Sequence, residues 1–144
     1  MNRSMSAIKR YNHLTGEINA VYHRMSLKLG LSDSASIILY TICDSGDACP
    51  LRDICRLSGL SKQTVNSALR RLEADGAVRL EAAGPRNKTV CLTEAGKLLA
   101  DRTARRIIRA ENEVFAAWPP EDVEAYLTLT ERFLSDIRGK ADRM

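Results

Sequence analysis

The chain has 144 residues, of which 44% are hydrophobic, 28% charged and 5% aromatic, and its formal net charge is +4. This length suits one domain or two small lobes that share a core, and the apolar fraction argues against disorder. No apolar stretch approaches the about 20 residues of a membrane span, and none follows the first residues as in a secretory signal, so we expect a cytoplasmic protein whose four cysteines are thiols.

Two helices are predicted in the first third of the chain. Apolar side chains recur every three or four positions over about 6–29, the spacing of one long amphipathic helix, although Gly16 lies inside it. Gly30 suits the end of this helix, and Ser32 suits the N-cap of a second helix that runs to about Asp44. Because the second helix is apolar nearly all round, we expect it at the centre of the core.

Two further helices are predicted in the middle of the chain. The composition of residues 44–48 is that of a loop. A short helix then follows over about 51–57, and a longer one over about 62–75. Ser61 is a suitable N-cap for the longer helix, and Gly76 a suitable C-terminal residue.

A β-hairpin and two helices complete the predicted order. Polar and apolar residues alternate over 78–82 and 88–92, on either side of a basic Gly-Pro turn, which predicts an antiparallel hairpin. One long helix is predicted over about 94–118 and a last one over about 121–138, separated by the two prolines at 119–120.

The predicted fold is mainly α with a small β-hairpin wing. A short helix, a glycine-containing turn, a capped helix and a hairpin are the arrangement of a winged helix-turn-helix. We expect residues 1–144 to form a single unit. In it, residues 31–96 are the winged helix-turn-helix DNA-binding lobe, and residues 1–30 and 97–144 form a helical dimerisation region.

The helix predicted over 62–75 has an apolar face and a polar face. Val65, Ala68, Leu69 and Leu72 form the apolar stripe. The polar face carries side chains that can hydrogen-bond to base edges: Lys62, Gln63, Asn66, Ser67 and Arg70. Phosphate contacts are predicted for Ser61, Thr64 and Arg71. No acidic residue occurs from Lys62 to Arg71, which favours DNA binding over an ordinary solvated face.

The positive charge is concentrated in the same region. Residues 51–92 hold eight basic and four acidic residues, a net charge of +4, whereas residues 1–50 carry +1 and residues 93–144 carry −1. This distribution favours a nucleic-acid partner. The rival interpretation is a winged-helix module that binds another protein instead of DNA.

From Leu29 to Gly96 the sequence resembles the MarR family of winged-helix transcriptional regulators. The matching stretches are ICRLSGLSKQTVNSALRRLEADGAV at 54–78 and LTEAG at 92–96, and the C-terminal PPEDVEAYLTLTERFLSDI fits the family layout. The resemblance implies a homodimer whose first and last helices intertwine. It also implies two recognition helices in successive major grooves of a pseudo-palindromic double-stranded DNA operator.

The resemblance also gives the wing a role. The family's wing tip reads Asp-x-Arg, and its arginine enters the minor groove. Counted back from Leu92, these positions are Gly84, Pro85 and Arg86, so Arg86 is predicted in the minor groove, with Lys88 as an additional phosphate contact. Gly84 replaces the aspartate that helps to hold the tip, which leaves the geometry of this wing open.

Two helical ends of this length also favour a dimer on physical grounds. Their apolar stripes are longer than the core of one chain can cover, and burying them against a second copy removes apolar surface from water. The competing arrangement is a monomer in which the three long helices pack together.

The cysteines admit two interpretations. Cys43, Cys49 and Cys55 have the spacing Cys-x5-Cys-x5-Cys, which some iron–sulfur regulators of another family use, so a thiol- or metal-responsive regulator is an alternative. Cys43 and Cys55 also suit small, buried apolar positions. Cys91 points away from the face of Val90 and Leu92, so we expect it to be the most exposed thiol.

The remaining residues concern a signal and enzymatic activity. The family often binds small aromatic or anionic effectors, and the candidate pocket residues are Tyr11, Tyr22, Met25 and Tyr40, whose spacing also suits core positions. No nucleotide-binding, hydrolase or metalloprotease motif occurs, so we expect neither an enzyme nor a metal or cofactor. The expected function is a dimeric, sequence-specific DNA-binding transcriptional regulator, a repressor released by a small-molecule or chemical signal.

Overall fold

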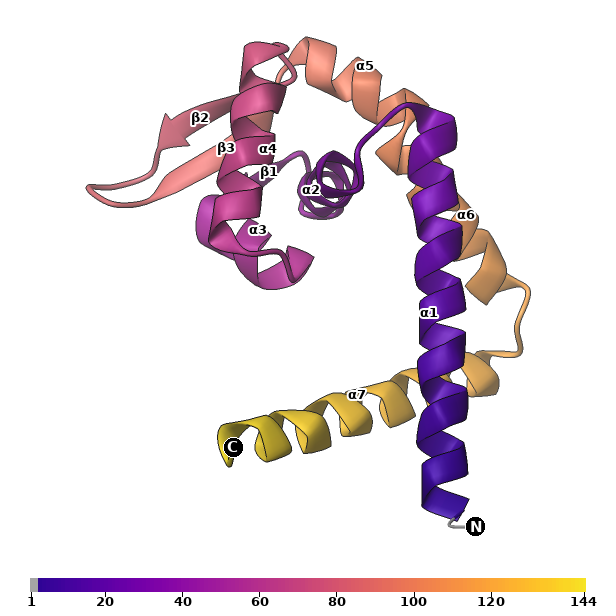
Figure 1. The fold of residues 1–144 in the computed structure, drawn as a ribbon. Helices are drawn as coiled ribbons and strands as arrows, with labels where there is room; N and C mark the ends of the chain where they lie inside the picture. Colours follow the sequence, from indigo (N-terminus) through magenta and orange to yellow (C-terminus); the bar gives the residue numbers. More distant parts are fainter. Residues whose placement is uncertain (1–2) are drawn as a thin grey trace. The chain divides into compact units, whose positions relative to one another are not determined.

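The computed structural model describes residues 3–144, with side chains from residue 6 onward (Figure 1). The residues up to Ile107 form one compact unit, and Ile108–Met144 form a second. In the described part of the chain, no helix is long and apolar enough to span a membrane.

The structure confirms the mainly helical fold with a β-hairpin wing. The elements in chain order are α1 (Arg3–Leu29), α2 (Asp33–Asp44), β1 (Ala48–Pro50), α3 (Leu51–Ser58), α4 (Lys62–Ala74), β2 (Val78–Ala82), β3 (Lys88–Leu92), α5 (Glu94–Arg102), α6 (Ala104–Ala116) and α7 (Pro120–Asp142). The predicted hairpin strands, 78–82 and 88–92, have the observed bounds.

Three of the helices begin where a side chain caps them. The hydroxyl oxygens of Ser32, Ser61 and Thr93 accept hydrogen bonds from the backbone N–H groups three residues later, at distances of 3.0–3.2 Å. Each bond satisfies a donor that the first turn of a helix otherwise leaves unpaired. These caps are local signals, which is why the starts of α2, α4 and α5 were predictable from the sequence.

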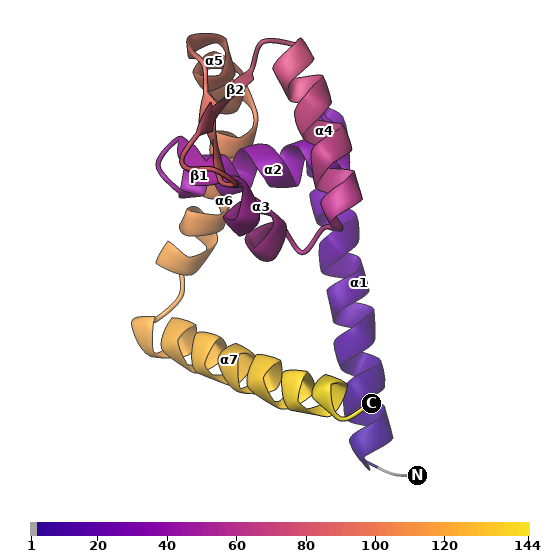
Figure 2. The same ribbon diagram turned by 90° about the vertical axis from the view of Figure 1, so that its left-hand side faces the viewer.

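Helix α2 is the centre of the first unit, as predicted. Its side chains Ile38, Leu39 and Ile42 are fully buried. The helix contacts α3, α4, α5 and the sheet, and Figure 2 shows it between the sheet and α4. The first unit is therefore built around one apolar helix rather than around the hairpin.

A third strand was missed by the sequence prediction. Residues 44–48 were expected to be loop, but β1 begins at Ala48 and pairs antiparallel with β3, so the sheet order is β1-β3-β2. A strand of three residues is too short for an alternating pattern, and its Pro50 has no N–H to donate. It exists only because β3 offers a free edge, which is a tertiary feature.

The extra strand explains why the prediction for Cys91 is wrong. Cys91 lies on the central strand, opposite Ala48 of β1 on one side and Arg79 of β2 on the other. Only 8% of its surface is exposed, and Cys49 is buried to 1%. The half-buried thiols are Cys43 and Cys55.

The long helix predicted over 94–118 is two helices. The backbone leaves the helical conformation at Thr103 (φ −130°, ψ −95°), between α5 and α6. Thr103 is buried, and its hydroxyl donates a hydrogen bond of 2.7 Å to the carbonyl oxygen of Leu99. Such back-bonding by threonine bends helices, and no glycine or proline marks the break in the sequence.

Thr93 and Gly96 of the LTEAG stretch hold α5 against the turn after α4. The Thr93 N–H donates to the carbonyl oxygen of Ala77 at 3.1 Å, and the Thr93 hydroxyl donates to the carbonyl oxygen of Gly76. A Cβ atom at Gly96 would overlap the backbone carbonyl of Ala77. Only glycine allows this close approach of α5 to the chain between α4 and β2.

A second tether joins α6 to the turn before β1. The Arg105 Nη2 donates hydrogen bonds of 2.9 and 3.0 Å to the two carboxylate oxygens of Asp47, and its Nε lies 2.8 Å from Asp101 Oδ1. Asp47 has a positive φ of 72°, an uncommon conformation for a residue other than glycine. The arginine therefore holds this turn, and with it the start of β1, to the helical segment.

The second unit consists of the end of α6 and α7. Phe115, Trp118 and Tyr126 form a cluster of three rings where these two helices meet, with centroid distances of 5.2–6.1 Å. Helix α7 extends to Asp142, beyond the predicted end at Arg138, and none of its side chains is buried. Its apolar stripe is therefore exposed in the single chain.

Candidate nucleic-acid interface

Helix α4 has the two faces that its sequence predicts. Val65, Leu69 and Leu72 are buried, and Ala68 packs against the core. The ten predicted DNA-binding residues lie on α4, at its cap and on the wing: Ser61, Lys62, Gln63, Thr64, Asn66, Ser67, Arg70, Arg71, Arg86 and Lys88. All of them are exposed except Asn66, which is half-buried.

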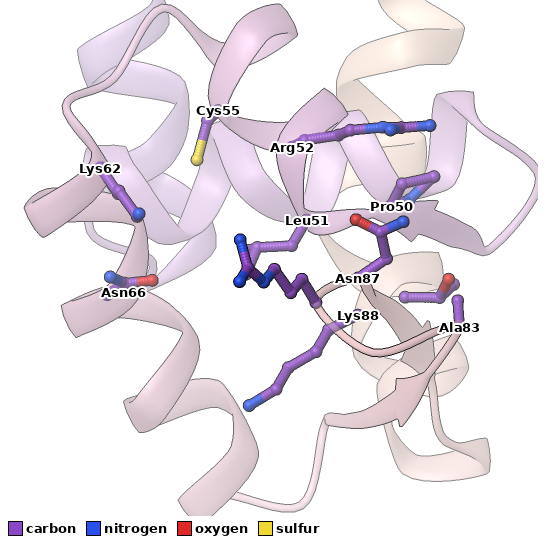
Figure 3. Close-up of a pocket in the computed structure, with 11 residues that line it drawn as sticks. Pro50, Leu51, Arg52, Cys55, Lys62, Asn66, Ala83, Asn87 and Lys88 are labelled. Carbon is purple, nitrogen blue, oxygen red and sulfur yellow. The ribbon is translucent and has the colours of Figure 1, made fainter.

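A groove of about 620 Å³ lies between α4 and the wing, and α3 forms part of it (Figure 3). We call it the wing groove. Its lining residues are Pro50, Leu51, Arg52, Cys55, Lys62, Asn66, Ala83, Arg86, Asn87, Lys88 and Thr89. Four of them are cations and none is acidic, so the groove is suited to a polyanion.

A second groove, of about 780 Å³, lies on the other side of α4. Its lining residues are Gly30, Leu31, Ser32, Ser34, Ala35, Gln63, Thr64, Ser67, Ala68, Arg71, Leu72, Asp75 and Leu99. Its one arginine is matched by one aspartate, and four of its side chains are hydroxyls. The positive charge is therefore gathered on the wing side of α4.

The predicted reading face is thus divided between two grooves. Lys62 and Asn66 face the wing groove together with Arg86 and Lys88. Gln63, Thr64, Ser67 and Arg71 line the second groove instead. Ser61 and Arg70 line neither of the two, and Arg70 is an exposed side chain of α4.

The cations of the wing groove are not neutralised by neighbouring carboxylates. In the region of excess charge, Arg56 pairs with Asp53 at 3.5 Å and Arg79 with Glu81 at 2.9 Å. The hydrogen bond that Arg79 donates to the Glu81 carboxylate raises the pKa of Arg79. Within residues 3–144, no ion pair involves a cation of the wing groove. Their charge remains available to an anionic partner.

The tip of the wing closes without the aspartate of the family motif. The Ala83 N–H donates a hydrogen bond of 2.8 Å to the carbonyl oxygen of Asn87. Gly84 has a φ of 139°, a conformation that residues with a Cβ atom rarely adopt. Glycine therefore stands at this position because the turn needs its backbone freedom, and Arg86 is exposed at the tip.

The wall of the wing groove that β1 and α3 supply was not predicted from the sequence. Pro50 of β1 and Leu51, Arg52 and Cys55 of α3 were not predicted as DNA-binding residues, because α3 comes next to the wing through the pairing of β1 with β3. Cys55 was predicted only as a buried apolar residue or as part of a thiol- or metal-responsive site. The regional charge count was the one available signal, since Arg52 is among the eight basic residues of 51–92.

The cysteines do not form a ligand set. Among the described residues, no group of three or more His, Cys, Asp or Glu side chains is placed to hold a metal ion. Burial raises the pKa of the Cys43 thiol above its ordinary value, although the nearby Arg105 acts in the opposite direction. Burial also raises the pKa of Cys91.

The rate of thiol alkylation at neutral pH is expected to follow the exposure of the four cysteines, of which Cys43 and Cys55 are half-buried and Cys49 and Cys91 buried. Cys55, in the open wing groove, should react first with iodoacetamide, and Cys49 and Cys91 last. A raised pKa leaves less thiolate at neutral pH, so the rate at Cys43 should keep rising above the ordinary thiol pKa of about 8.5. Peptide mass spectrometry after timed alkylation measures each rate, and early labelling of Cys91 would contradict the observed burial.

The predicted effector residues lie in the first unit. Tyr11 and Tyr22 are exposed residues of α1, Met25 is half-buried, and Tyr40 of α2 packs against the core. They line neither of the two grooves. An effector pocket formed by these residues stays a prediction.

One family model and 220 chains of solved structures match this chain. Residues 29–86 match the model of the MarR family. A MarR family transcriptional regulator from Silicibacter pomeroyi is 28% identical, with a TM-score of 0.70 over 91% of this chain and 89% of that chain.

Two further structures share the fold at lower identity. Sco3205, a MarR family transcriptional regulator from Streptomyces coelicolor solved in complex with DNA, is 19% identical, with a TM-score of 0.74 over 94% of this chain and 88% of that chain. BpsR from Bordetella bronchiseptica, whose DNA binding is regulated by 6-hydroxynicotinic acid, is 20% identical, with a TM-score of 0.64 over 86% of this chain and 98% of that chain. None of the curated proteins is similar enough to match.

Proposed function

Through its residues 29–86 this chain belongs to the MarR family, and we propose that it is a homodimeric, sequence-specific DNA-binding transcriptional regulator. In this proposal residues 31–96 are the DNA-binding lobe, and residues 1–30 and 97–144 form the dimerisation region. The regulator is a repressor that a small-molecule or chemical signal releases from a pseudo-palindromic operator.

The wing groove is the observation that carries the proposal. Cations from three segments line it without any carboxylate, directly beside the polar face of α4. Neutralising DNA phosphates releases condensed counterions, which supplies much of the affinity of proteins for DNA. A protein-binding winged helix has no comparable need for an acid-free cationic groove.

The polar face of α4 is proposed to read the bases in the major groove. The residues assigned to contact bases or nearby phosphates are Lys62, Gln63, Asn66, Ser67 and Arg70. The residues assigned to contact the phosphate backbone of the DNA are Ser61, Thr64 and Arg71. Arg86 enters the minor groove, and Lys88 contacts the phosphates at its wall.

The exposed apolar faces of α1 and α7 support the homodimer. On α1, Ile8, Leu14 and Ile18 are each exposed to nearly half of their surface, and on α7 the same holds for Leu134 and Ile137. Contiguous exposed apolar faces on long helices are typical of protein interfaces. A two-fold dimer places two α4 helices on two half-sites, which requires a pseudo-palindromic operator.

Regulation by a small molecule is supported by the likeness to BpsR. Its DNA binding is regulated by 6-hydroxynicotinic acid, and it shares the fold of this chain. The proposed effector contacts are the four residues predicted from the sequence, Tyr11, Tyr22, Met25 and Tyr40.

Arg70 and Arg71 allow base reading to be separated from phosphate binding. We expect Arg70→Ala to weaken binding to the DNA upstream of the coding region by about 1–3 kcal/mol, or about 5- to 150-fold, and to change the sequence preference. Arg71→Ala should weaken binding to all sequences by one common factor. Fluorescence anisotropy with the upstream DNA and with a random duplex of equal length measures both.

The two duplexes also test the function itself. A wild-type protein that binds both equally would contradict a sequence-specific regulator and favour a winged helix with a protein partner. If Arg70→Ala lowers the affinity for both duplexes by the same factor, Arg70 contacts the DNA backbone and not a base.

A further inference from the structure

Arg52 contributes a cation to the wing groove from outside the recognition helix and the wing. It is the second residue of α3, which begins directly after β1. Figure 3 shows its side chain leaving α3 in the direction away from Lys62 and Asn66 of α4, while Lys88 enters from the wing. The cations of the groove are therefore spread around it, and they do not converge on one point.

Arg52 is also free to bind an anion. Its side chain is exposed, and within the described chain it forms no ion pair. Arg56, one helical turn later on the same helix, is also exposed but differs in its ion pairing and in its place relative to the groove. It pairs with Asp53 at 3.5 Å, and it does not line the groove.

We infer that Arg52 binds a backbone phosphate of the DNA, and that the wing groove holds one edge of the DNA backbone between α3, α4 and the wing. The inference rests on the proposed function and adds α3 to the DNA-binding surface. A spread of cations along a groove matches successive phosphates of a strand better than it matches a single small anion. Because Arg52 lies on α3 and not on α4, it positions the DNA and reads no base.

The test compares Arg52→Ala, Arg52→Lys and Arg56→Ala with the wild-type protein. The affinity for the upstream DNA and for a random duplex is measured over a range of salt concentrations. We expect Arg52→Ala to reduce the slope of log affinity against log salt by about 0.9 per subunit. It should weaken binding to both duplexes by the same factor, whereas Arg52→Lys and Arg56→Ala keep the wild-type slope.

The controls make each outcome decisive. Arg52 is exposed, so the variant should keep the thermal unfolding midpoint of the wild type, which is checked first. If the wild-type protein binds DNA and Arg52→Ala has the same slope as Arg56→Ala, Arg52 is not a phosphate contact. A loss that differs between the two duplexes would make it a base contact. A wild-type protein that binds no DNA would overturn the proposed function, and this inference with it.

Discussion

Replacing Gly96 by alanine is expected to lower the free energy of unfolding by about 3 kcal/mol or more. The added Cβ would overlap the backbone carbonyl of Ala77, which cannot turn aside as a flexible side chain can. Helix α5 would have to move away from the turn after α4, and the hydrogen bonds of Thr93 to Gly76 and Ala77 would break. Urea denaturation at a fixed protein concentration measures the effect as a lower midpoint.

Gly16→Ala is the matched control. A Cβ atom at Gly16 meets nothing within 4 Å, and the residue lies inside α1. Alanine is favoured over glycine in a helix interior by about 0.5–1 kcal/mol, so this variant should be as stable as the wild type or more stable. Wild-type stability of the Gly96→Ala protein would show that α5 does not need this close approach.

Placing a glutamate at Leu134 is expected to dissociate the dimer. Leu134 is 47% exposed on the apolar stripe of α7 in the single chain. Burying a leucine side chain is worth about 1.5–3 kcal/mol and two-fold symmetry repeats it, so its loss should raise the dissociation constant of the dimer by about 100-fold or more. A monomer reaches one half-site only, so DNA affinity should also fall by about 100-fold or more.

Ser135→Glu is the control for Leu134→Glu, since it adds the same charge at an exposed position of α7 that lies off the apolar stripe. Sedimentation velocity should find the mass of two chains for the wild type and for Ser135→Glu, and the mass of one chain for Leu134→Glu. If both variants remain dimeric, the stripe of α7 is not part of the interface. A monomeric wild type would contradict the dimer altogether.

Much of the fold was predictable because its signals are local. The caps at Ser32, Ser61 and Thr93 and the periodic apolar residues of the helices are properties of a few neighbouring residues. Strand β1 and the break at Thr103 are not, since each depends on segments far away in the sequence or on burial. The burial of Cys91 was wrongly predicted for the same reason, because it follows from β1.

The candidate site divides in the same way. The polar face of α4 was found from residue types at helical spacing, and the structure places those residues on the surface. That this face borders two grooves of different charge was not predictable, because their other walls come from α2, α3 and the wing. Arg52 is the clearest case, since only the folded chain brings it to the groove that Lys62 and Lys88 line.

The salt dependence of DNA binding by the wild-type protein tests the account most directly. Phosphate contacts are assigned to three cations of each subunit, Arg52, Arg71 and Lys88, so the log affinity of a dimer for the upstream DNA should fall linearly with log salt, with a slope of about −5. At physiological salt, binding should be in the range of about 10⁻⁸–10⁻¹¹ M and tighter than to a random duplex. Binding that is micromolar or weaker, with no preference for the upstream DNA and a flat response to salt, would contradict a DNA-binding regulator.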